Sequence, residues 1–505
     1  MTVAALQIRS GEAVPIARVP VLPMEDFRAR LVDAGKRLRL AALFGRPLAD
    51  DALRLHSVLA DDRNGSLLVA ATDVSETYPS LTPACTQAHW FEREIAEQWG
   101  VQPVGHPWLK PIRFHASYRP GHDAWGRAAG AAIEPGVTEF FQVTGEEVHE
   151  VAVGPVHAGV IEPGHFRFQC FGETVLHLEI SLGYQHRGVE RALRGGDARR
   201  AIHYIETLAG DTSIGHATAY AQAVEALAGA RTPARAQALR AIALELERLA
   251  NHTGDLGALA GDVGFLPAAA YCGRLRGDFL NLTALLCGNR FGRGLVRPGG
   301  VLWDLEPSRR DDLLARLGRI EADVRNAAEL LFSVPSVLAR FEETGEVSAA
   351  DCVALGLVGP PARACALERD VRQDFPSGFF RFTQMPVATW NTGDVFGRAF
   401  VRWLEMQRSM QFIRELLAHL PEGPVSASCG GLAPDSLVVT LTEGWRGEIC
   451  HVILTDARGQ RAFHKVVDPS FHNWMGLAVA LRGQQIADFP LCNKSFNLSY
   501  CGHDL

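Results

Sequence analysis

From Asp197 onward, the sequence is dominated by long segments whose apolar residues recur at helical spacing. In TPARAQALRAIALELERLANHTGDLG (232–257), the stripe Leu239, Ile242, Leu246 and Leu249 is typical of a helix packed against a core. Thr232 as N-cap and Pro233 as the first helical residue predict where this helix begins. Further helices are expected at Ala268–Leu286, Pro307–Leu331 and Val395–His419. Several long helices must therefore share one core.

Strand patterns lie on either side of these helices. SLLVAATDV (Ser66–Val74) predicts a strand, and Phe166–Tyr184 predicts a hairpin that turns at Gly172-Glu173. Near the end of the chain, GEICHVILTD and RAFHKVVDP predict a two-stranded hairpin across 457–459. In the first hundred residues, helices are expected at Phe27–Leu40 and Thr86–Gly100, the second ended by its glycine.

The fold class expected from these patterns is α+β. A small N-terminal α+β domain at 1–118 is followed by a linker and entry strand at 119–150, because Pro120–Gly136 is rich in glycine and alanine. A large, mainly helical domain with strand layers at one end fills 151–505. A chain of 505 residues is long enough for both.

Composition excludes several classes of protein. A net charge of −7 argues against nucleic acid as a partner, because phosphate binding needs a concentrated basic surface. No run of eighteen apolar residues exists, so we expect no transmembrane segment, and the N-terminus has no signal-peptide pattern. The ten cysteines include no C-x-x-C pair, so we expect no iron–sulfur cluster in this chain. No G-x-G-x-x-G follows a strand, so NADH chemistry would belong to a partner.

Two sets of motifs resemble known families. TQAHWFEREIAEQWGVQPVGHPWLKPIRF (86–114) resembles the thirty-kilodalton subunit of respiratory complex I. The remainder resembles the forty-nine-kilodalton subunit of complex I and the large subunits of group 4 [NiFe] hydrogenases. The runs that carry this second resemblance include GPVHAGVIEPGHFRF (154–168), GYQHRGVER (183–191), RAIALELERLANH (240–252), ACALERDVRQDFP (364–376) and VVDPSFHNW (466–474). The resemblance covers roughly residues 80 to 505. Both subunits in one chain is the arrangement of the formate hydrogenlyase large subunit.

The resemblance also assigns four metal-ligand positions. In the hydrogenases, two C-x-x-C pairs hold a nickel–iron centre, because soft, anionic thiolates stabilise these metals. The first pair aligns with Ala209 and Thr212, which share a helix face with His216, and the second aligns with Ser499 and Gly502. None of these residues offers a thiolate, and Cys501 is one position away. We therefore predict that this chain has no nickel–iron site.

Complex I uses the same region for a quinone headgroup. The family's quinone tyrosine aligns with Gly210, and its hairpin histidine aligns near Pro163, two residues from His165. His165 is thus the candidate for a quinone contact, because histidine can bond a quinone oxygen and deliver a proton.

The resemblance implies further polar residues facing this cavity: Glu162, His165, His186, Arg187, Glu190, Asp211, His216, Asp370 and Arg372. One interpretation is a proton path, in which Glu162 and Glu190 carry protons, the histidines relay them, and Asp370 pairs with Arg372 at the wall. The alternative is structural polarity, satisfied by hydrogen bonds at a subunit interface.

Three functional hypotheses follow from the resemblance. The leading one is an oxidoreductase subunit of a complex I-like or hydrogenase-related membrane complex, peripheral on the inner, cytoplasmic face of the cell membrane. It would pack against an iron–sulfur small subunit and membrane-embedded ion-translocating subunits, and couple electron arrival to proton or quinone chemistry. The second is an active group 4 hydrogenase, which the four missing cysteines argue against. The third is a non-catalytic scaffold whose cavity is filled in.

Overall fold

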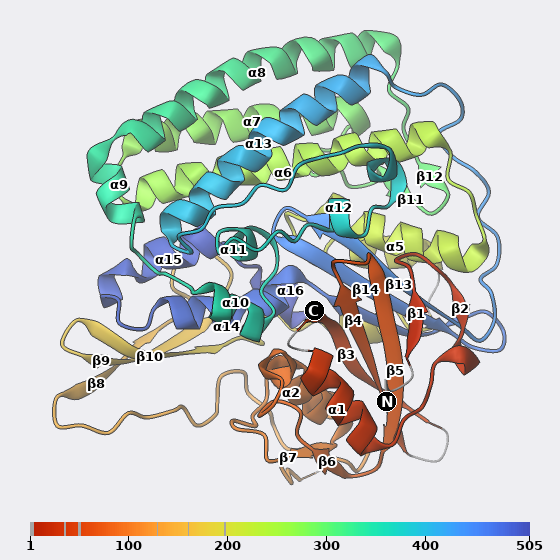
Figure 1. Cartoon of the computed structure of the whole chain (residues 1–505), viewed down its shortest axis with the longest axis vertical. Helices are drawn as coiled ribbons and strands as arrows, with labels where there is room; N and C mark the ends of the chain where they lie inside the picture. The colour runs from red at the N-terminus through yellow and green to blue at the C-terminus, as the bar shows by residue number, and fades with distance from the viewer. Residues whose placement is uncertain (1–4, 35–36, 49–51, 129, 160, 196–197) are drawn as a thin grey trace.

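The structure is a computed structural model that describes residues 5–34, 37–48, 52–128, 130–159, 161–195 and 198–505. Its mixed α+β fold confirms the fold class predicted from the sequence. Figure 1 shows long helices alongside one another, the C-terminal sheet next to them, and the N-terminal sheet beyond it. In the described part of the chain, no helix combines the length and the apolar character needed to cross a membrane.

The N-terminal part carries a four-stranded antiparallel sheet, ordered β1-β5-β4-β3. The elements of this N-terminal part of the chain are β1 (Leu6–Ile8), β2 (Val14–Pro15), η1 (Ile16–Arg18), α1 (Met24–Ala34), β3 (Arg39–Pro47), β4 (Leu53–Asp61), β5 (Ser66–Val74), β6 (Thr77–Pro79), η2 (Thr86–Ala88), α2 (His89–Trp99) and β7 (Gln102–Val104). Gly100 ends α2 in the left-handed conformation, as predicted. The helix expected at Phe27–Leu40 is wrong at its end, because Arg39–Leu43 is buried as a strand and carries no helical period.

The predicted hairpin after the linker is confirmed. It consists of β9 (His165–Phe171) and β10 (Thr174–Ser181), which turn at Gly172 with φ +54°, and β8 (Val148–Val153) pairs with the other edge of β9. Figure 1 shows this three-stranded sheet projecting from the side of the molecule.

The helical layer is formed mainly by α6 (Ala234–Asp262), α7 (Leu266–Cys287), α8 (Pro307–Ser333) and α13 (Val395–Ala418). Smaller elements surround it: α3 (Val189–Ala192), α4 (Ala198–Ile205), α5 (Ser213–Ala228), β11 (Val296–Arg297), β12 (Gly300–Val301), α9 (Pro335–Phe341), α10 (Ala349–Leu355), α11 (Gly359–Arg363), α12 (Val371–Asp374) and η3 (Gly378–Phe382). The predicted start of α6 is wrong by one residue. Pro233 is its N-cap, with extended backbone (ψ 149°), and the side chain of Thr232 makes no capping bond.

The C-terminal part adds β13 (Ser436–Gly444), β14 (Gly447–Thr455), β15 (Arg461–Val467), α14 (Pro469–Ala480), η4 (Ile486–Asp488), α15 (Phe489–Phe496) and α16 (Tyr500–Asp504). The predicted hairpin β14–β15 exists, but it is half of a four-stranded sheet ordered β15-β14-β13-β2. Helix α5 covers one face, where Thr440 donates to the carbonyl of Ala219, and Phe463 stacks on Phe44 of β3. Because the sheet is covered on both sides, its inward side chains are sealed from water.

A buried network of charges joins the helical layer to β13. Both carboxylate oxygens of Glu405 on α13 are engaged, one by Arg363 Nε at 2.8 Å and the other by His252 Nε2 at 2.9 Å. Burial opposes ionisation of Glu405, but Arg363 and His252 outweigh it and hold its pKa well below the usual range. Glu405 is thus a fixed anion between α6, α11 and α13.

The first prediction concerns this anion. Glu405→Gln should lower the free energy of unfolding by about 3 kcal/mol, because it removes a buried anion that pairs with Arg363 and His252 and leaves Glu443 and Asp370 as the remaining carboxylates beside Arg363. Equilibrium urea unfolding followed by tryptophan fluorescence measures the change. Glu415→Gln, at an exposed position of the same helix, is the matched control and should change stability by less than about 0.5 kcal/mol. Equal effects of the two substitutions would contradict the prediction.

Candidate functional site

The four positions that the resemblance assigns to metal ligands lie together inside the molecule. Ala209 and Thr212 precede α5, while Ser499 and Gly502 belong to the turn that opens α16, and all four are buried. Arg187 bridges the two pairs, because one of its nitrogens donates to the carbonyl of Leu208 at 2.9 Å and to that of Cys501 at 3.1 Å. We refer to this region as the four-position site.

An arginine–aspartate ion pair fills the space beside Thr212. Arg446, in the turn between β13 and β14, donates to both carboxylate oxygens of Asp211 at 2.5 and 2.7 Å. Its guanidinium lies 3.8 Å from the centre of the Trp445 ring, and it also donates to Thr212 Oγ1 at 3.3 Å. Burial opposes ionisation of Asp211, but Arg446 outweighs it and lowers the pKa of that carboxyl. The pair is therefore charged at neutral pH.

The carboxylate of Asp468 stands against Gly502. A Cβ atom added to Gly502 would lie 2.7 Å from Asp468 Cγ, closer than real Cβ atoms approach other atoms. Asp468 is held in place as the N-cap of α14, where it accepts a bond from the Ser470 amide at 2.8 Å. Any side chain at position 502 would have to displace this cap.

A chain of three histidines runs inward from Asp468. His216 Nε2 lies 3.0 Å from Asp468 Oδ2, and its Nδ1 lies 3.2 Å from His451 Nε2. His451 Nδ1 in turn lies 3.0 Å from His464 Nε2. All three rings are completely buried. We call these four residues the histidine chain. Among the residues that the structure describes, His464 Nδ1 has no hydrogen-bond partner.

A second buried carboxyl lies at the start of α5. Glu247 accepts bonds from the amides of Ile214 at 2.7 Å and Gly215 at 3.1 Å. Despite these bonds, burial dominates and raises the pKa of Glu247 to about 8. A small cavity that Glu247 shares with Asp211, Asn251 and Arg290 adjoins it. Unlike Asp211, Glu247 can thus gain and lose a proton near neutral pH.

Comparison with known proteins gives two family matches. Residues 262–431 match the 49-kDa subunit of respiratory-chain NADH dehydrogenase, and residues 45–124 match its 30-kDa subunit. The carbon monoxide-induced hydrogenase of Rhodospirillum rubrum is 33% identical over 350 residues, which cover 69% of this chain and 97% of that protein. The chain belongs to the complex I and group 4 hydrogenase large-subunit family.

Two other members align with most of this chain. Formate hydrogenlyase subunit 5 of Escherichia coli is 29% identical over 84% of this chain and 76% of its own length. One NADH-quinone oxidoreductase subunit of Bdellovibrio bacteriovorus, designated C/D, is 26% identical over 84% of this chain and 82% of its own length. The expected resemblance is therefore confirmed, with complex I 30-kDa-type and 49-kDa-type domains in one chain.

The residues of the four-position site do not fit the nickel–iron centre that the hydrogenase resemblance implies for these positions. Alanine and glycine supply no ligand, and Thr212 Oγ1 is already bonded to Trp445 Nε1 at 3.1 Å as well as to the Asp211–Arg446 pair. Ser499 Oγ caps α16 by accepting from the Gly502 amide at 2.9 Å. Within the described part of the chain, no three His, Cys, Asp or Glu side chains are placed to hold a metal ion.

Some predicted site residues gather at the four-position site. Asp211, His216 and Arg187 lie there, as described above. Glu162 joins them, because its carboxylate accepts a bond from the Tyr500 amide at 3.2 Å. His165 lies at the start of β9, where its Nε2 accepts from Arg167 Nε at 3.2 Å and its ring packs 5.2 Å from that of Phe140.

Two others lie at the contact with the N-terminal part. His186 stacks on His115 at 4.5 Å, and burial lowers its pKa to about 4. Glu190 accepts from Lys465 and from the Val466 amide, both at 2.9 Å. Burial opposes ionisation of Glu190, but Lys465 and Arg113 outweigh it and lower its pKa to about 2. The structure therefore does not support the proton-carrier role predicted for Glu190, which stays ionised at neutral pH.

Asp370 and Arg372 lie elsewhere. They form a two-bond ion pair at 2.9 and 2.6 Å, and Arg372 also donates to Glu245 at 3.0 Å. This pair belongs to the charge network around Glu405 rather than to the four-position site, and Arg372 lines a separate cavity described below.

Sequence reasoning missed Arg446, Asp468, His451, His464 and Glu247. A signal existed for the two strand histidines. His451 pairs with Val466, so His464, two residues before Val466, points to the same face of the sheet. No local pattern could show Arg446, because its partner Asp211 is 235 positions away.

The second prediction concerns Gly502. Gly502→Ala should destabilise the protein by about 1–3 kcal/mol, because its Cβ would clash with Asp468. Gly430→Ala, at an exposed glycine with open space around it, is the control and should have little effect. In a double-mutant cycle measured by urea unfolding, Gly502→Ala should destabilise the Asp468→Ala variant much less than it destabilises the natural chain. Additive effects would show that the two residues do not compete for space.

The third prediction concerns the titration of Glu247. Its pKa in the folded protein is raised to about 8, so the stability linked to its protonated form is fully present below about pH 4.5 and is lost as pH rises through 8. Glu247→Gln should therefore become more stable relative to the natural chain between about pH 5 and 8.5, by up to about 4 kcal/mol. Thermal unfolding across this range measures the difference. Glu329→Gln, at an exposed position, should follow the natural chain at every pH.

Proposed function

We propose that this chain is a fused peripheral subunit of a membrane-associated electron-transfer complex, in which it couples electron arrival in a partner subunit to proton movement. The observation that carries the proposal is the buried histidine chain, which ends at Asp468 beside the four-position site. The family supplies the context, because its members include hydrogenases and NADH-quinone oxidoreductases.

The hydrogen-bond pattern of the histidine chain allows only two neutral arrangements of its protons. When His216 Nε2–H donates to Asp468, His216 Nδ1 accepts from His451 Nε2–H, and His451 Nδ1 accepts from His464 Nε2–H. The lone pair on His464 Nδ1, a buried atom without a hydrogen-bond partner among the described residues, is then the end at which a proton would enter. A proton added there lets each ring pass its Nε2 proton to the next, and the last proton reaches the Asp468 carboxylate. One proton is taken up at His464 and one is delivered to Asp468, and all three rings have changed from the Nε2–H to the Nδ1–H tautomer.

The first protonation of this transfer, on His464, lies within the energetic cost that an enzyme can bear. Burial lowers the pKa of His464 to about 3, and burial and the neighbouring rings lower that of His451 well below its usual value. A transient positive charge on His464 at pH 7 therefore costs about 5 kcal/mol. An enzyme with about a thousand turnovers per second has an activation free energy of about 13 kcal/mol, so this cost fits within it. Neutral rings suit such a relay, because they stay uncharged between transfers.

A proton that reaches Asp468 changes the charge beside neighbouring ionisable groups, and this is how its arrival could influence them. Arg446 and Asp211 form a fixed ion pair, and Glu247 binds a proton near neutral pH. Charge placed nearby by an electron on a partner's cluster would shift the balance between Glu247, Asp468 and the histidine chain. That shift is the coupling that we propose.

The partners that we propose are an iron–sulfur small subunit and membrane-embedded ion-translocating subunits, with the complex on the cytoplasmic face of the cell membrane. A quinone is the proposed electron acceptor, by likeness to the NADH-quinone oxidoreductase members. Within this chain, His165 keeps the proposed quinone contact, because it is the predicted histidine nearest the family's hairpin position. Its Nε2 accepts a bond from Arg167, so a quinone oxygen would accept from Nδ1–H, which now faces the carbonyl of Gly154 at 3.4 Å.

A scaffold without chemistry is the second candidate. The observation in its favour is the filling of the four-position site by Arg446, Asp211 and Trp445. The histidine chain distinguishes the two, because a scaffold does not require titratable rings in a line. Hydrogenase activity has no comparable support, since the donor set does not fit the metals.

The complex itself can be tested by purifying the native protein in mild detergent and identifying the subunits that accompany it by mass spectrometry. An iron–sulfur subunit together with membrane proteins supports the proposal, and any dehydrogenase among them identifies the electron donor. Recovery of the chain alone from detergent extracts would overturn it.

The fourth prediction tests the relay. His451→Gln keeps one donor and one acceptor in the buried line but cannot pass a proton, so the complex should assemble while proton transfer falls about 100-fold or more. Proton uptake by membrane vesicles driven by the native electron donor measures the effect. His419→Gln, an exposed histidine at the end of α13, is the control. Normal proton uptake in assembled His451→Gln complexes would leave the scaffold as the better explanation.

A further inference from the structure

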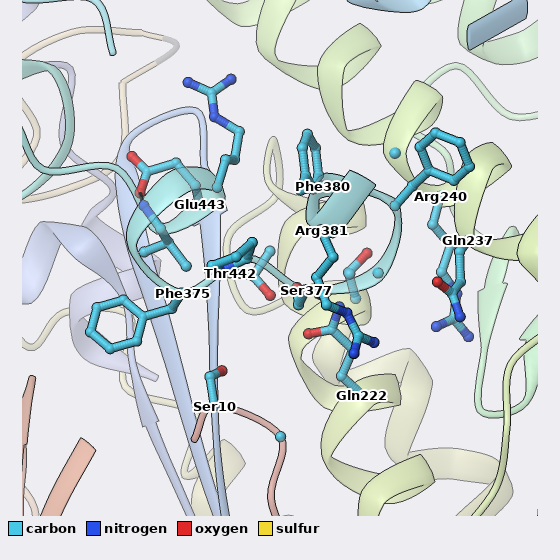
Figure 2. A pocket seen from close by; sticks show the side chains of 18 of the residues that line it. Ser10, Gln222, Gln237, Arg240, Phe375, Ser377, Phe380, Arg381, Thr442 and Glu443 are labelled. Carbon is cyan, nitrogen blue, oxygen red and sulfur yellow. Dashed lines mark hydrogen bonds between the residues drawn. The ribbon is translucent and has the colours of Figure 1, made fainter. Parts of the chain in front are cut away.

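A cavity of about 710 Å³ lies apart from the four-position site, and none of the four positions lines it. Its walls come from α5, α6, β13, the segment 371–381 and the N-terminal turn at 9–11. Figure 2 shows side chains from these elements around the opening. The volume falls within the range of small-molecule sites. The coupling role proposed above makes no use of this cavity.

The carboxylates in the cavity wall are largely neutralised by the protein itself. Glu225 is held by Arg240 at 2.6 Å and by the Gly299 amide at 2.7 Å. Glu443 is held by Arg363 at 2.8 Å and by the Val371 amide at 3.0 Å. Burial raises the pKa of Asp374 to about 7, so this carboxyl is half protonated at neutral pH.

Three arginines in the same wall have no such partners. Arg9, Arg231 and Arg381 are exposed, and among the described residues none of their guanidinium groups has a hydrogen bond or an ion pair. The cavity therefore carries an uncompensated positive charge in a chain whose net charge is −7. Guanidinium groups match the oxygens of phosphate and carboxylate in paired bonds, so this charge selects oxyanions.

The remaining wall offers polar and aromatic contacts. Gln222 Nε2 donates to Ser377 Oγ at 3.0 Å, and Figure 2 shows Arg381 reaching toward Gln222 from the opposite wall. Phe375 and Phe379 add apolar surface. An occupant that carries both oxyanion groups and a flat apolar ring would satisfy both kinds of surface.

We infer that this cavity binds a nucleotide-sized anion, whose oxyanion groups are held by Arg9, Arg231 and Arg381 and whose ring packs near Phe379. The three arginines supply the affinity for charge. The aromatic side adds a preference for a ring over a bare phosphate. The ligand would bind without touching the histidine chain or the four-position site.

Titration calorimetry on the full-length chain tests this inference, with ATP and inorganic pyrophosphate as the probes. ATP should bind more tightly than pyrophosphate, because only ATP offers a ring. Arg231→Gln and Arg381→Gln should each weaken the binding of both probes by about tenfold or more. Phe379→Leu should weaken ATP and leave pyrophosphate unchanged.

Arg319→Gln is the matched control, because it removes the same charge from an exposed position of α8 outside the cavity. It should bind both probes as the natural chain does. Since Arg231 and Arg381 are exposed and unpaired within the described part of the chain, their replacement should leave the urea midpoint unchanged. Binding of neither probe would overturn the inference, as would equal losses in Arg319→Gln and Arg381→Gln. Tight capture of a partner subunit's acidic segment, with no competition from ATP, would overturn it in favour of a protein interface.

Discussion

The ion pair between Arg446 and Asp211 is the interaction on which the centre of this structure depends. It ties the turn between β13 and β14 to the residues that open α5, and the same guanidinium donates to the carbonyl of Asn497 ahead of α16. A guanidinium removed from water is costly unless it finds a counter-charge and hydrogen bonds, and Arg446 is 4% exposed. Here the two-bond geometry, the indole ring of Trp445 and the hydroxyl of Thr212 supply them. Segments more than 200 residues apart are thereby fixed around one point.

This arrangement also explains how the fold persists without metal ligands. In the hydrogenase pattern that the resemblance implies, four anionic thiolates face two metal cations. In this chain the positions are neutral, the charges of Arg446 and Asp211 beside them balance within the protein, and the Asp468 carboxylate is hydrogen-bonded to His216 and to the Ser470 amide. Gly502 is part of the same solution, because only a residue without a side chain leaves room for the Asp468 carboxylate.

Much of the fold could be predicted from the sequence, for reasons that particular elements make clear. Apolar residues at helical spacing predict the helices α7, α8 and α13, and Gly172 predicts the turn of the hairpin formed by β9 and β10. The end of α1 could not be predicted, because the apolar run Leu40–Phe44 that follows it belongs to strand β3, is buried on both faces and shows no strand alternation. β13 (Ser436–Gly444) was not predicted either, and every one of its residues is buried.

The candidate site was less predictable, because residue type does not determine protonation. Glu190 and Glu247 are both buried glutamates, yet Lys465 keeps the first ionised while burial lets the second titrate near neutral pH. Likewise, a histidine becomes a relay only when another ring stands at hydrogen-bond distance on each side. His451 meets that condition because α5 delivers His216 to one face of β14, while β15 places His464 diagonally across the ladder on the same face. The proposed relay thus depends on the packing of α5 on a sheet sealed from water, and none of the four aligned metal-ligand positions takes part in it.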